Sequence, residues 1–328
     1  MSSIALTGSE GYIGRALERE LQRSEPSTAI IGIDRTPSEG DPAGVHALDL
    51  SSVAVDELCK RIGGVQTVFH LAAARTDWGL TYEGYYRDNV RATRTLIEAC
   101  KASGVSRIVY TGTVGVYGPS HAPIDESAPF NATTHYGLTK AQAERELIEA
   151  AQEHRWSLRI LRPSAVFSEY APPNTNIYRL VEAIRRRRFV MIGDGSEVKT
   201  TSYLHNVVDA ILWLYRDLDS GGIAAFNYVD EPRLTTREMV GVIRGELGRR
   251  GPALRLPLGL VDAPARLLDV VGNAIGKDFP ITSARIRKFC TSTNFDSSAI
   301  RAAGFTPRYS SVDALKRTVA WHRDGRPA

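Results

Sequence analysis

The sequence predicts an α/β protein with a doubly wound parallel sheet and a smaller C-terminal lobe. In the first half of the chain, short β-rich runs alternate with helical patterns, which is typical of βαβ units. A glycine-rich turn (Gly8, Gly11 and Gly14) lies between the first predicted strand and the first predicted helix. After Pro163 the alternation breaks at the proline-rich residues 171–174 and later elements are less regular. These observations place the sheet in the first half and the smaller lobe after it.

The elements follow one another in the order that this architecture requires. Strands are predicted at residues 3–6, 29–34, 67–71, 107–111 and 157–161, and helices at residues 13–23, 90–103 and 136–153. Leu96, Ile97 and Cys100 supply part of an apolar face for the helix at 90–103. A helix at 207–214 is expected to pack back on the sheet, and the chain from about residue 235 is expected to be mostly helical. We therefore predict a nucleotide-binding domain over residues 1–168, with 200–228 returning to the sheet, and a substrate-binding lobe from residues 169–199 and 229–328.

The composition of the 328 residues predicts a soluble enzyme of a reducing compartment. Hydrophobic residues make up 43% and charged residues 24%, and the net charge of +4 is too small for a dedicated nucleic-acid binder. The four arginines at 185–188 are expected to form a solvated face at a helix end. No apolar stretch reaches the ~20 residues of a membrane helix, and a strand-like run begins by Ile4, too early for a signal peptide. Three widely spaced cysteines without metal-ligand spacing favour free thiols, so a cytoplasmic location is expected, with no metal.

The glycine-rich turn predicts a dinucleotide site of the Rossmann type. Gly8 permits the tight turn, Gly11 lets the backbone approach a pyrophosphate, and Gly14 permits close contact between helix and strand. The amino end of the following helix offers unpaired N–H groups and a positive dipole end to the phosphates.

The residue that ends the second strand predicts which dinucleotide binds. Asp34 lies 20 residues beyond Gly14, where a carboxylate accepts hydrogen bonds from the adenosine ribose hydroxyls. A carboxylate there repels a 2′-phosphate, which favours NAD over NADP. Arg35 keeps NADP open, because a guanidinium can hold that phosphate.

Tyr136 and Lys140 are candidates for acid/base chemistry. Four residues apart on a predicted helix, they lie on the same side about one turn from each other. A phenol keeps its proton at neutral pH, and an ammonium beside it favours the phenolate. The pair therefore predicts a tyrosine that accepts and donates a proton.

The ordered motifs resemble the extended short-chain dehydrogenase/reductase family, the group of NAD-dependent epimerases and dehydratases. Beside the glycine turn and the Tyr/Lys pair, the matching segments are Asp49-Leu50, residues 70–73 (His-Leu-Ala-Ala), Asn89-Val90, residues 111–118 with Thr113 at the catalytic Ser/Thr position, residues 161–163 (Leu-Arg-Pro), 203–209 and 304–307. Between residues 4 and about 210 their shared order is specific.

This resemblance implies an NAD-dependent enzyme with Thr113, Tyr136 and Lys140 as catalytic residues. Tyr136 would be the general base, Lys140 would lower its pKa and hold the nicotinamide ribose, and Thr113 would hydrogen-bond the reacting oxygen. The implied cofactor-binding residues are Gly8, Glu10, Gly11, Tyr12, Ile13, Asp34, Arg35, Asp49, Leu50, Leu71, Ala72, Ala73, Asn89, Thr111, Tyr136, Lys140, Pro163 and Val166. The implied substrate-binding residues are Arg75, Trp78, Thr113 and Lys199, with Thr76 and Asp77 beside Trp78. The family also implies a homodimer.

The substrate is less well specified than the chemistry. The main expectation is oxidation of a sugar hydroxyl, C4 most often, in a nucleotide sugar. Where nucleotide-sugar members carry an Asn and an Arg for the phosphates, this chain has Ala165 and Lys199, and a lysine lacks the bidentate fork of an arginine. Residues 285–288 (Arg-Ile-Arg-Lys) offer further positive charge, and residues 280–289 are loosely similar to sugar-active members of surface-polysaccharide pathways.

Two alternatives stay open. One is a hydroxysteroid-like or other secondary alcohol dehydrogenase or ketoreductase, whose pocket the apolar run at 256–275 could wall. The other is an NAD-binding regulator without catalysis, which the presence of both Tyr136 and Lys140 disfavours.

Overall fold

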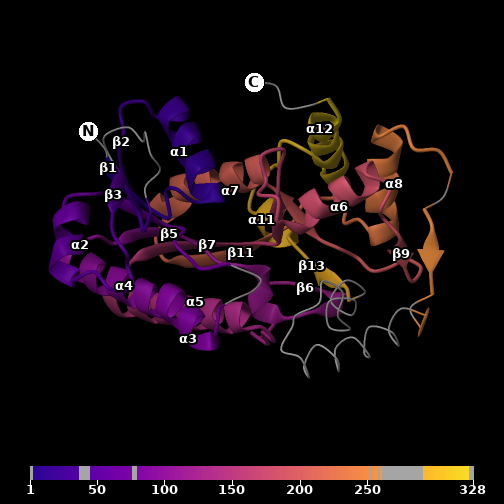
Figure 1. The fold of residues 1–328 in the computed structure, drawn as a ribbon. Coiled ribbons are helices and arrows are strands. Elements are labelled where there is room, and N and C mark those ends of the chain that lie inside the picture. Colours follow the sequence, from indigo (N-terminus) through magenta and orange to yellow (C-terminus); the bar gives the residue numbers. More distant parts are fainter. Residues whose placement is uncertain are drawn as a thin grey trace.

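The centre of the molecule is a seven-stranded sheet with the strand order β11-β7-β5-β4-β1-β2-β3, in which neighbouring strands are parallel (Figure 1). The computed structural model describes residues 3–36, 45–75, 80–251, 253–257, 259–260 and 291–324. The strands of the sheet are β1 (Ser3–Thr7), β2 (Ala29–Asp34), β3 (Val45–Ala47), β4 (Thr67–His70), β5 (Arg107–Thr111), β7 (Ser157–Pro163) and β11 (Ile223–Tyr228). The strand order reverses between β1 and β4, and ligands of open α/β sheets bind beyond the carboxyl ends of the strands at such a point.

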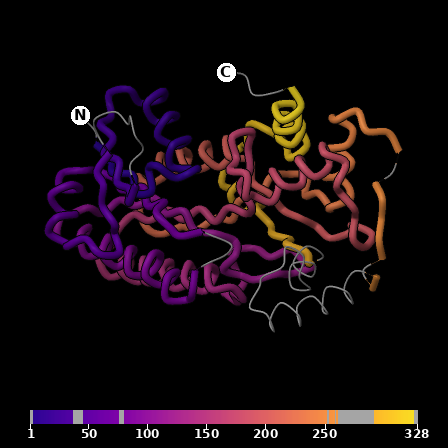
Figure 2. Tube along the Cα trace, viewed as in Figure 1, coloured from indigo at the N-terminus to yellow at the C-terminus, as the bar shows by residue number. Residues whose placement is uncertain are grey.

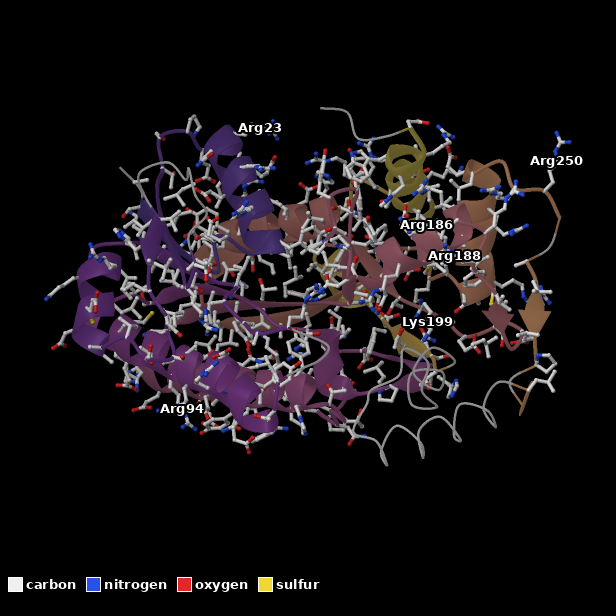
Figure 3. The ribbon with its side chains drawn as sticks, in the orientation of Figure 1. Arg23, Arg94, Arg186, Arg188, Lys199 and Arg250 are labelled. Atoms are coloured by element: carbon white, nitrogen blue, oxygen red, sulfur yellow. The ribbon has the colours of Figure 1, made fainter. Side chains whose placement is uncertain are left out.

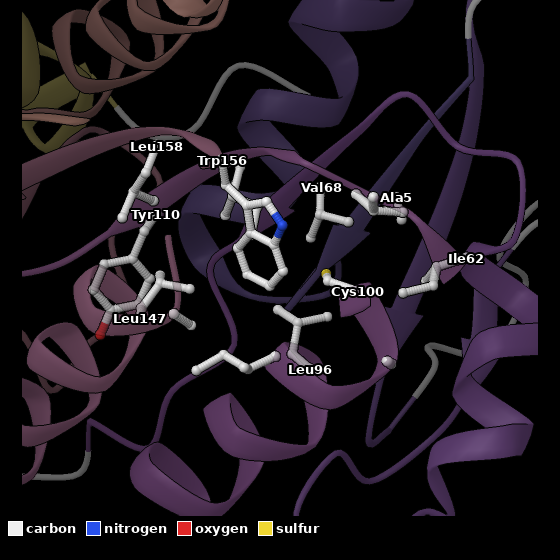
Figure 4. Close-up of a cluster of buried hydrophobic side chains, with 14 of the residues drawn as sticks. Ala5, Ile62, Val68, Leu96, Cys100, Tyr110, Leu147, Trp156 and Leu158 are labelled. Atoms are coloured by element: carbon white, nitrogen blue, oxygen red, sulfur yellow. The ribbon is translucent and has the colours of Figure 1, made fainter. Parts of the chain in front are cut away.

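Helices cover both faces of the sheet, as the doubly wound prediction requires. One face carries α1 (Tyr12–Ser24) and α7 (Leu204–Asp217), and the other carries α2 (Val55–Ile62), α4 (Ala92–Ser103) and α5 (His135–His154). Along β1, Ile4 and Leu6 pack toward α1 and α7 while Ala5 packs toward α2 and α4, because successive strand residues face opposite sides. Each face of the sheet packs an apolar cluster against its helices. Figure 4 shows the cluster on the side of α2, α4 and α5, where Cys100 and Trp156 lie among aliphatic side chains.

Short helical turns connect some of these strands and helices. They are α3 (Tyr82–Tyr85), the π-helical turn η1 (Tyr86–Arg91) and the 3-10 turns η2 (Val114–Tyr117) and η3 (Leu218–Ser220).

A third apolar cluster joins the helices that lie beyond the sheet. Val181 of α6 (Asn176–Arg185), Met239 of α8 (Thr236–Glu246) and Leu315 of α12 (Ser311–Asp324) belong to it. The remaining elements are the strand pairs β8 (Ala165–Phe167) with β10 (Thr201–Tyr203), β9 (Met191–Ile192) with β12 (Arg255–Leu256) and β6 (Ser120–Ile124) with β13 (Thr293–Phe295), and the helix α11 (Ser298–Ala302). Figure 2 traces the chain from the sheet to α6 and back through α7, which contacts α1. The division at residue 168 stays a prediction.

Most sheet elements lie where the sequence predicts them. The bounds of β2 and β5 match the prediction, and α5 extends it by one residue at each end. The strand expected to reach Leu71 ends at His70, and the helix expected from residue 90 is preceded by η1, so that Asn89 lies inside a π-helical turn. The sequence pattern does not predict β3, which has three residues, or β11, where the adjacent Ala224 and Ala225 weaken the β signal.

Two further findings concern the composition of the chain. In the part of the chain that the structure describes, none of the helices combines the length and the apolar character needed to cross a membrane. Cys59 and Cys100 are free thiols, and Cys290 lies outside the described residues.

Candidate active site

The glycine-rich turn packs so tightly that side chains do not fit at its first and last glycines. Gly8 has a φ of 72°, and a Cβ there would lie 2.7 Å from the backbone nitrogen of Ala72. A Cβ on Gly14 would lie 2.0 Å from the carbonyl oxygen of Gly8. Gly11 is the N-cap of α1 without a side-chain cap, and the first turn of α1 contains no acidic residue. The amino end of α1 is therefore suited to an anion such as a pyrophosphate.

Asp34 lies beside this turn at the end of β2. Its Oδ2 accepts the backbone N–H of Glu10 at 3.1 Å, and its Oδ1 accepts that of Thr36 at 3.2 Å. A carboxylate has about four acceptor positions, so these two bonds leave capacity for ribose hydroxyls. The position fits the predicted adenosine ribose contact.

Arg35 is held by two carboxylates. Its Nη2 lies 2.9 Å from Oδ1 of Asp88 and its Nε lies 3.1 Å from Oδ2 of Asp49. The hydrogen bond to Asp88 raises the pKa of Arg35. Asp49 also accepts hydrogen bonds from the backbone and the hydroxyl of Ser51, at 2.9 and 2.7 Å. Because two carboxylates engage the guanidinium, the site favours NAD over a dinucleotide with a 2′-phosphate.

Asn89 fixes the loop that follows β4 against α5. Its Oδ1 accepts the backbone N–H of Ala74 at 2.8 Å, and its Nδ2 donates to Oγ1 of Thr139 at 3.0 Å. The same loop begins at Leu71 and Ala72, which lie against Gly8. Asn89 thus connects the glycine turn, the strand-end loop and the helix that carries Tyr136.

A chain of buried hydrogen bonds runs beneath these loops. Nδ1 of His70 lies 2.8 Å from Oγ1 of Thr7, and Nε2 lies 2.9 Å from Oγ1 of Thr93, which donates its own proton to the carbonyl of Asn89. Nε2 of His70 must therefore be the donor and Nδ1 the acceptor. Burial, and then the charge of Lys140, lowers the pKa of His70 to about 3, so the ring is neutral.

The elements that carry the predicted catalytic residues meet where α5 contacts η2. Thr134 caps α5 by accepting the N–H of Gly137 at 3.1 Å, and a Cβ on Gly137 would lie 2.6 Å from the carbonyl oxygen of Gly115. Thr113 caps η2 by accepting the N–H of Gly115 at 3.1 Å, so its hydroxyl proton can be donated elsewhere. Close contact at Gly137 therefore brings the turn that carries Tyr136 against the loop that carries Thr113.

Lys140 is buried behind Tyr136. Its ammonium donates to the carbonyl of Thr111 at 2.9 Å and lies 4.2 Å from the centre of the Tyr110 ring. Burial lowers the pKa of Lys140 to about 7, and the Glu144 carboxylate opposes this effect. The half-buried Tyr136 ring lies 6.2 Å from that of Tyr85.

Other predicted site residues have identifiable surroundings. Four of them, Ile13, Leu50, Leu71 and Val166, pack into the apolar clusters, and Pro163 ends β7. The side chains of Ala73 and Arg75 are exposed. Glu10 pairs with Arg15, and the hydroxyl of Tyr12 donates to Oγ of Ser168 at 2.6 Å. Lys199 donates to the carbonyl of Thr291. Trp78, Thr76, Asp77, the basic residues 285–288, residues 280–289 and most of the run at 256–275 lie outside the described residues.

The sequence interpretation missed a buried ion pair behind the catalytic residues. Arg162 donates from Nε and Nη2 to Oε1 of Glu144 at 2.9 and 2.5 Å, and from Nη1 to the hydroxyl of Tyr117. A signal was available, because Glu144 follows Lys140 by one helical turn and so lies on the same side of α5.

The fold and these residues define a dinucleotide-dependent oxidoreductase site of the short-chain dehydrogenase/reductase type. A profile described as NAD dependent epimerase/dehydratase family matches residues 4–227. The chain belongs to the NAD-dependent epimerase/dehydratase family, and NAD is its cofactor. The residues fit this group, because the uncapped α1, the glycine turn and Asp34 provide the contacts that a dinucleotide requires.

Individual relatives agree with this placement. The chain is 31% identical over 323 residues to N-acetyl-alpha-D-glucosaminyl-diphospho-ditrans,octacis-undecaprenol 4-epimerase of Escherichia coli O157:H7, with 97% of this chain and 95% of that protein covered. It is 27% identical to 2-alkyl-3-oxoalkanoate reductase of Stenotrophomonas maltophilia, covering 97% and 98%. Its structure matches that of MoeE5 in complex with UDP-glucose and NAD with a TM-score of 0.76 and 25% identity, covering 98% and 99%.

Proposed function

We propose that this protein is a 4-epimerase of a sugar carried on a diphosphate. The observation that supports the proposal is the packing of α5 on the segment after β5: Lys140 donates to the Thr111 carbonyl, and Gly137, next to Tyr136, lies against Gly115 in the turn that Thr113 caps. The names of the E. coli relative and of the MoeE5 complex both contain a sugar attached to a diphosphate. These two supports are independent, because one is local geometry and the other is similarity over nearly the whole chain.

In the proposed reaction, Tyr136 removes the proton of the C4 hydroxyl and later returns it. Thr113 donates its hydroxyl proton to the same oxygen, which steadies the charge that develops there. The Lys140 ammonium, anchored on the Thr111 carbonyl, favours the phenolate form of Tyr136. NAD, when bound, would supply a hydride acceptor and donor for C4, and the glycine turn, the amino end of α1 and Asp34 would hold it.

The diphosphate of the substrate is assigned to Lys199, with Arg75 and Trp78 as further substrate contacts. The support for Lys199 is its positive charge, and its ammonium also donates to the Thr291 carbonyl. Trp78 belongs to this proposal on its sequence position alone.

A second candidate substrate is a sugar linked through diphosphate to a polyprenol. Its support is a surface that we call the basic ribbon, which consists of the exposed residues Arg187, Arg188, Arg250, Leu254, Arg255, Leu256 and Leu260 around the β9–β12 pair. Figure 3 marks Arg188 and Arg250 on this side of the molecule. Within the described ranges, no acidic side chain pairs with its four arginines, whereas Arg185 and Arg186 pair with Glu182. Unpaired arginines beside exposed leucines suit an anionic lipid surface.

Two functions of other classes compete with an epimerase. The reductase of S. maltophilia represents the ketoreductase alternative, which would consume NADH without returning hydride to the sugar. A non-catalytic NAD-binding regulator would bind the cofactor and turn over nothing. Homodimerisation also stays a prediction, for which light scattering is the measurement.

The test compares UDP-N-acetylglucosamine with undecaprenyl-diphospho-N-acetylglucosamine in detergent micelles, with the C4 epimer followed by NMR. We expect conversion without net NADH formation, and a loss of at least ~100-fold in turnover for Tyr136→Phe with NAD affinity little changed. Tyr170→Phe is the control, because Tyr170 is exposed and packs on Trp321. Full turnover of Tyr136→Phe, or stoichiometric NADH consumption by the native protein, would contradict the proposal.

A charge-reversal pair separates the two substrate classes. If the lipid-linked sugar is the substrate, Arg187→Glu with Arg188→Glu weakens action in anionic micelles and leaves action on the UDP-sugar unchanged. Arg61→Glu, an exposed arginine of α2, is the matched control. Equal effects of the charge-reversal pair and of Arg61→Glu would contradict a role of the basic ribbon in binding the lipid-linked sugar.

A further inference from the structure

A buried carboxylate lies one helical turn behind the lysine of the proposed catalytic centre. Glu144 is fully buried, and Lys140 is 2% exposed on the same side of α5. Burying charges in this way is costly unless each has a partner. The two side chains therefore have to be considered together.

The two oxygens of Glu144 have different surroundings. Oε1 accepts both hydrogen bonds from Arg162, whose guanidinium lies 5.4 Å from the centre of the Tyr117 ring and 5.0 Å from that of Phe130. Oε2 is also buried, and no donor among the described residues reaches it. Arg162 thus holds the carboxylate through Oε1, whereas Oε2 carries negative charge without a hydrogen-bond donor among the described residues.

Gly112 makes room for this oxygen. A Cβ at that position would lie 2.8 Å from Oε2 of Glu144 and 3.2 Å from Cγ of Arg162. The preceding residue, Thr111, accepts the hydrogen bond of the Lys140 ammonium. Lys140 and Glu144 therefore lie against consecutive residues of the segment that leads to Thr113, namely Thr111 at the end of β5 and Gly112 after it.

Among the described residues, the other titratable groups around the pair place no negative charge near the Lys140 ammonium. Around Lys140 they are Tyr136 and Glu144 on α5, His70 on β4 and Tyr110 on β5; around Glu144 they are Lys140, Arg162 on β7, Tyr110 and Tyr117. His70 is neutral, and burial, followed by the charge of Glu144, raises the pKa of Tyr110 well above its ordinary value. Glu144 is left as the carboxylate that acts on the Lys140 ammonium.

We infer that Glu144 is a positioning residue for the proposed proton-transfer centre: held by Arg162, its carboxylate keeps Lys140 charged inside the fold. Burial alone lowers the pKa of Lys140, and Glu144 raises it. Without Glu144 the ammonium loses its proton at a lower pH, and Tyr136 then loses the charge that favours its phenolate. The role of Lys140 rests on the proposed function, but its charge can be measured without any substrate.

The experiment is an NMR titration of selectively ¹³C-labelled lysine in the full chain, with NAD absent and present. The Lys140 signal is assigned by its loss in Lys140→Met. We expect Glu144→Gln to lower the titration midpoint of Lys140 by about 1 pH unit or more, since an opposite charge at short range shifts a pKa by ~1–3 units. Glu146→Gln is the matched control, because Glu146 lies two residues further along α5 and pairs with the exposed Arg94 instead. We expect no shift in that variant.

A second variant guards against loss of folding, since Glu144→Gln leaves the buried Arg162 guanidinium without its partner. Glu144→Gln combined with Arg162→Met removes both charges, and we expect the Lys140 midpoint to fall in this variant as well. An unchanged midpoint in either folded variant overturns the inference.

Activity gives a separate readout with a different outcome. If the proposed epimerase reaction occurs, the pH at which kcat falls on the alkaline side moves down with the Lys140 midpoint in Glu144→Gln and stays in place in Glu146→Gln. If the midpoint moves but the native protein converts neither sugar, the electrostatic inference stands and the proposed function fails.

Discussion

Adding a single methyl group at Gly137 tests whether the contact between α5 and η2 sets the catalytic geometry. In Gly137→Ala the new Cβ would lie 2.6 Å from the carbonyl oxygen of Gly115 and 2.9 Å from Cβ of Ala132. Both neighbours belong to the chain around the site and not to the far ends of flexible side chains. The amino end of α5, with Tyr136 on it, must therefore move away from the loop that carries Thr113.

The size of the effect follows from these distances. Restoring an ordinary contact of 3.4 Å from 2.6 Å requires a displacement of about 0.8 Å. Overpacking of this kind costs ~1–3 kcal/mol, while replacing glycine by alanine within a helix returns about 1 kcal/mol. The net loss of stability is therefore small, about 0–2 kcal/mol. Misplacement of reacting groups by ~1 Å costs about 100-fold in rate, so we expect turnover to fall by ~10–100-fold.

The assay measures the melting temperature, NAD affinity by calorimetry and turnover of the sugar substrate. NAD affinity should stay within about threefold, because the glycine turn and Asp34 do not contact Gly137. Gly241→Ala is the control: Gly241 lies inside α8 with open space around its missing Cβ, so alanine should raise stability by up to about 1 kcal/mol and leave turnover unchanged. Turnover within twofold of the native value in Gly137→Ala would refute the reasoning.

Two other predictions concern the cofactor and the buried lysine. Asp34→Ala should weaken the binding of NAD by ~10–100-fold, as expected for loss of hydrogen bonds to a charged group, and weaken the binding of NADP less. Equal losses of affinity in calorimetry would contradict the role given to Asp34 in selecting NAD. Lys140 has a pKa of about 7 in the fold against an ordinary value of 10.5, so between these pH values the unfolded chain binds a proton that the folded chain does not. The free energy of unfolding therefore rises with pH across this window, by at most about 1.4 kcal/mol per unit. Lys140→Met should lose this slope in urea denaturation at pH 7, 8 and 9, and an identical slope in both proteins would contradict the assignment.

The parts of the site that the sequence predicted are those encoded by local spacing. The glycine turn, Asp34 and the Tyr136/Lys140 pair each depend on a strand end or on one helical turn. The spacing of residues along the chain is enough to locate such features. The contact between Gly137 and Gly115 has no such signal, because it joins a helix start to a loop 22 residues earlier in the chain. Glu144 was visible as one more residue on the Lys140 side of the helix, but its partner Arg162 lies on another strand. Sequence spacing thus predicts candidate residues for the chemistry, whereas the fold determines which contacts hold them.

The cofactor assignment shows this dependence most clearly. From the sequence alone, Asp34 favours NAD, while the adjacent Arg35 leaves NADP open, because the sequence does not show which groups the guanidinium contacts. The parallel sheet resolves the conflict by bringing Asp49, after β3, and Asp88, in η1, to the carboxyl ends of β2 and β1. A 2′-phosphate would then have to compete with two carboxylates for Arg35 while facing the charge of Asp34, so the same arginine that left NADP open in the sequence adds to the preference for NAD in the fold.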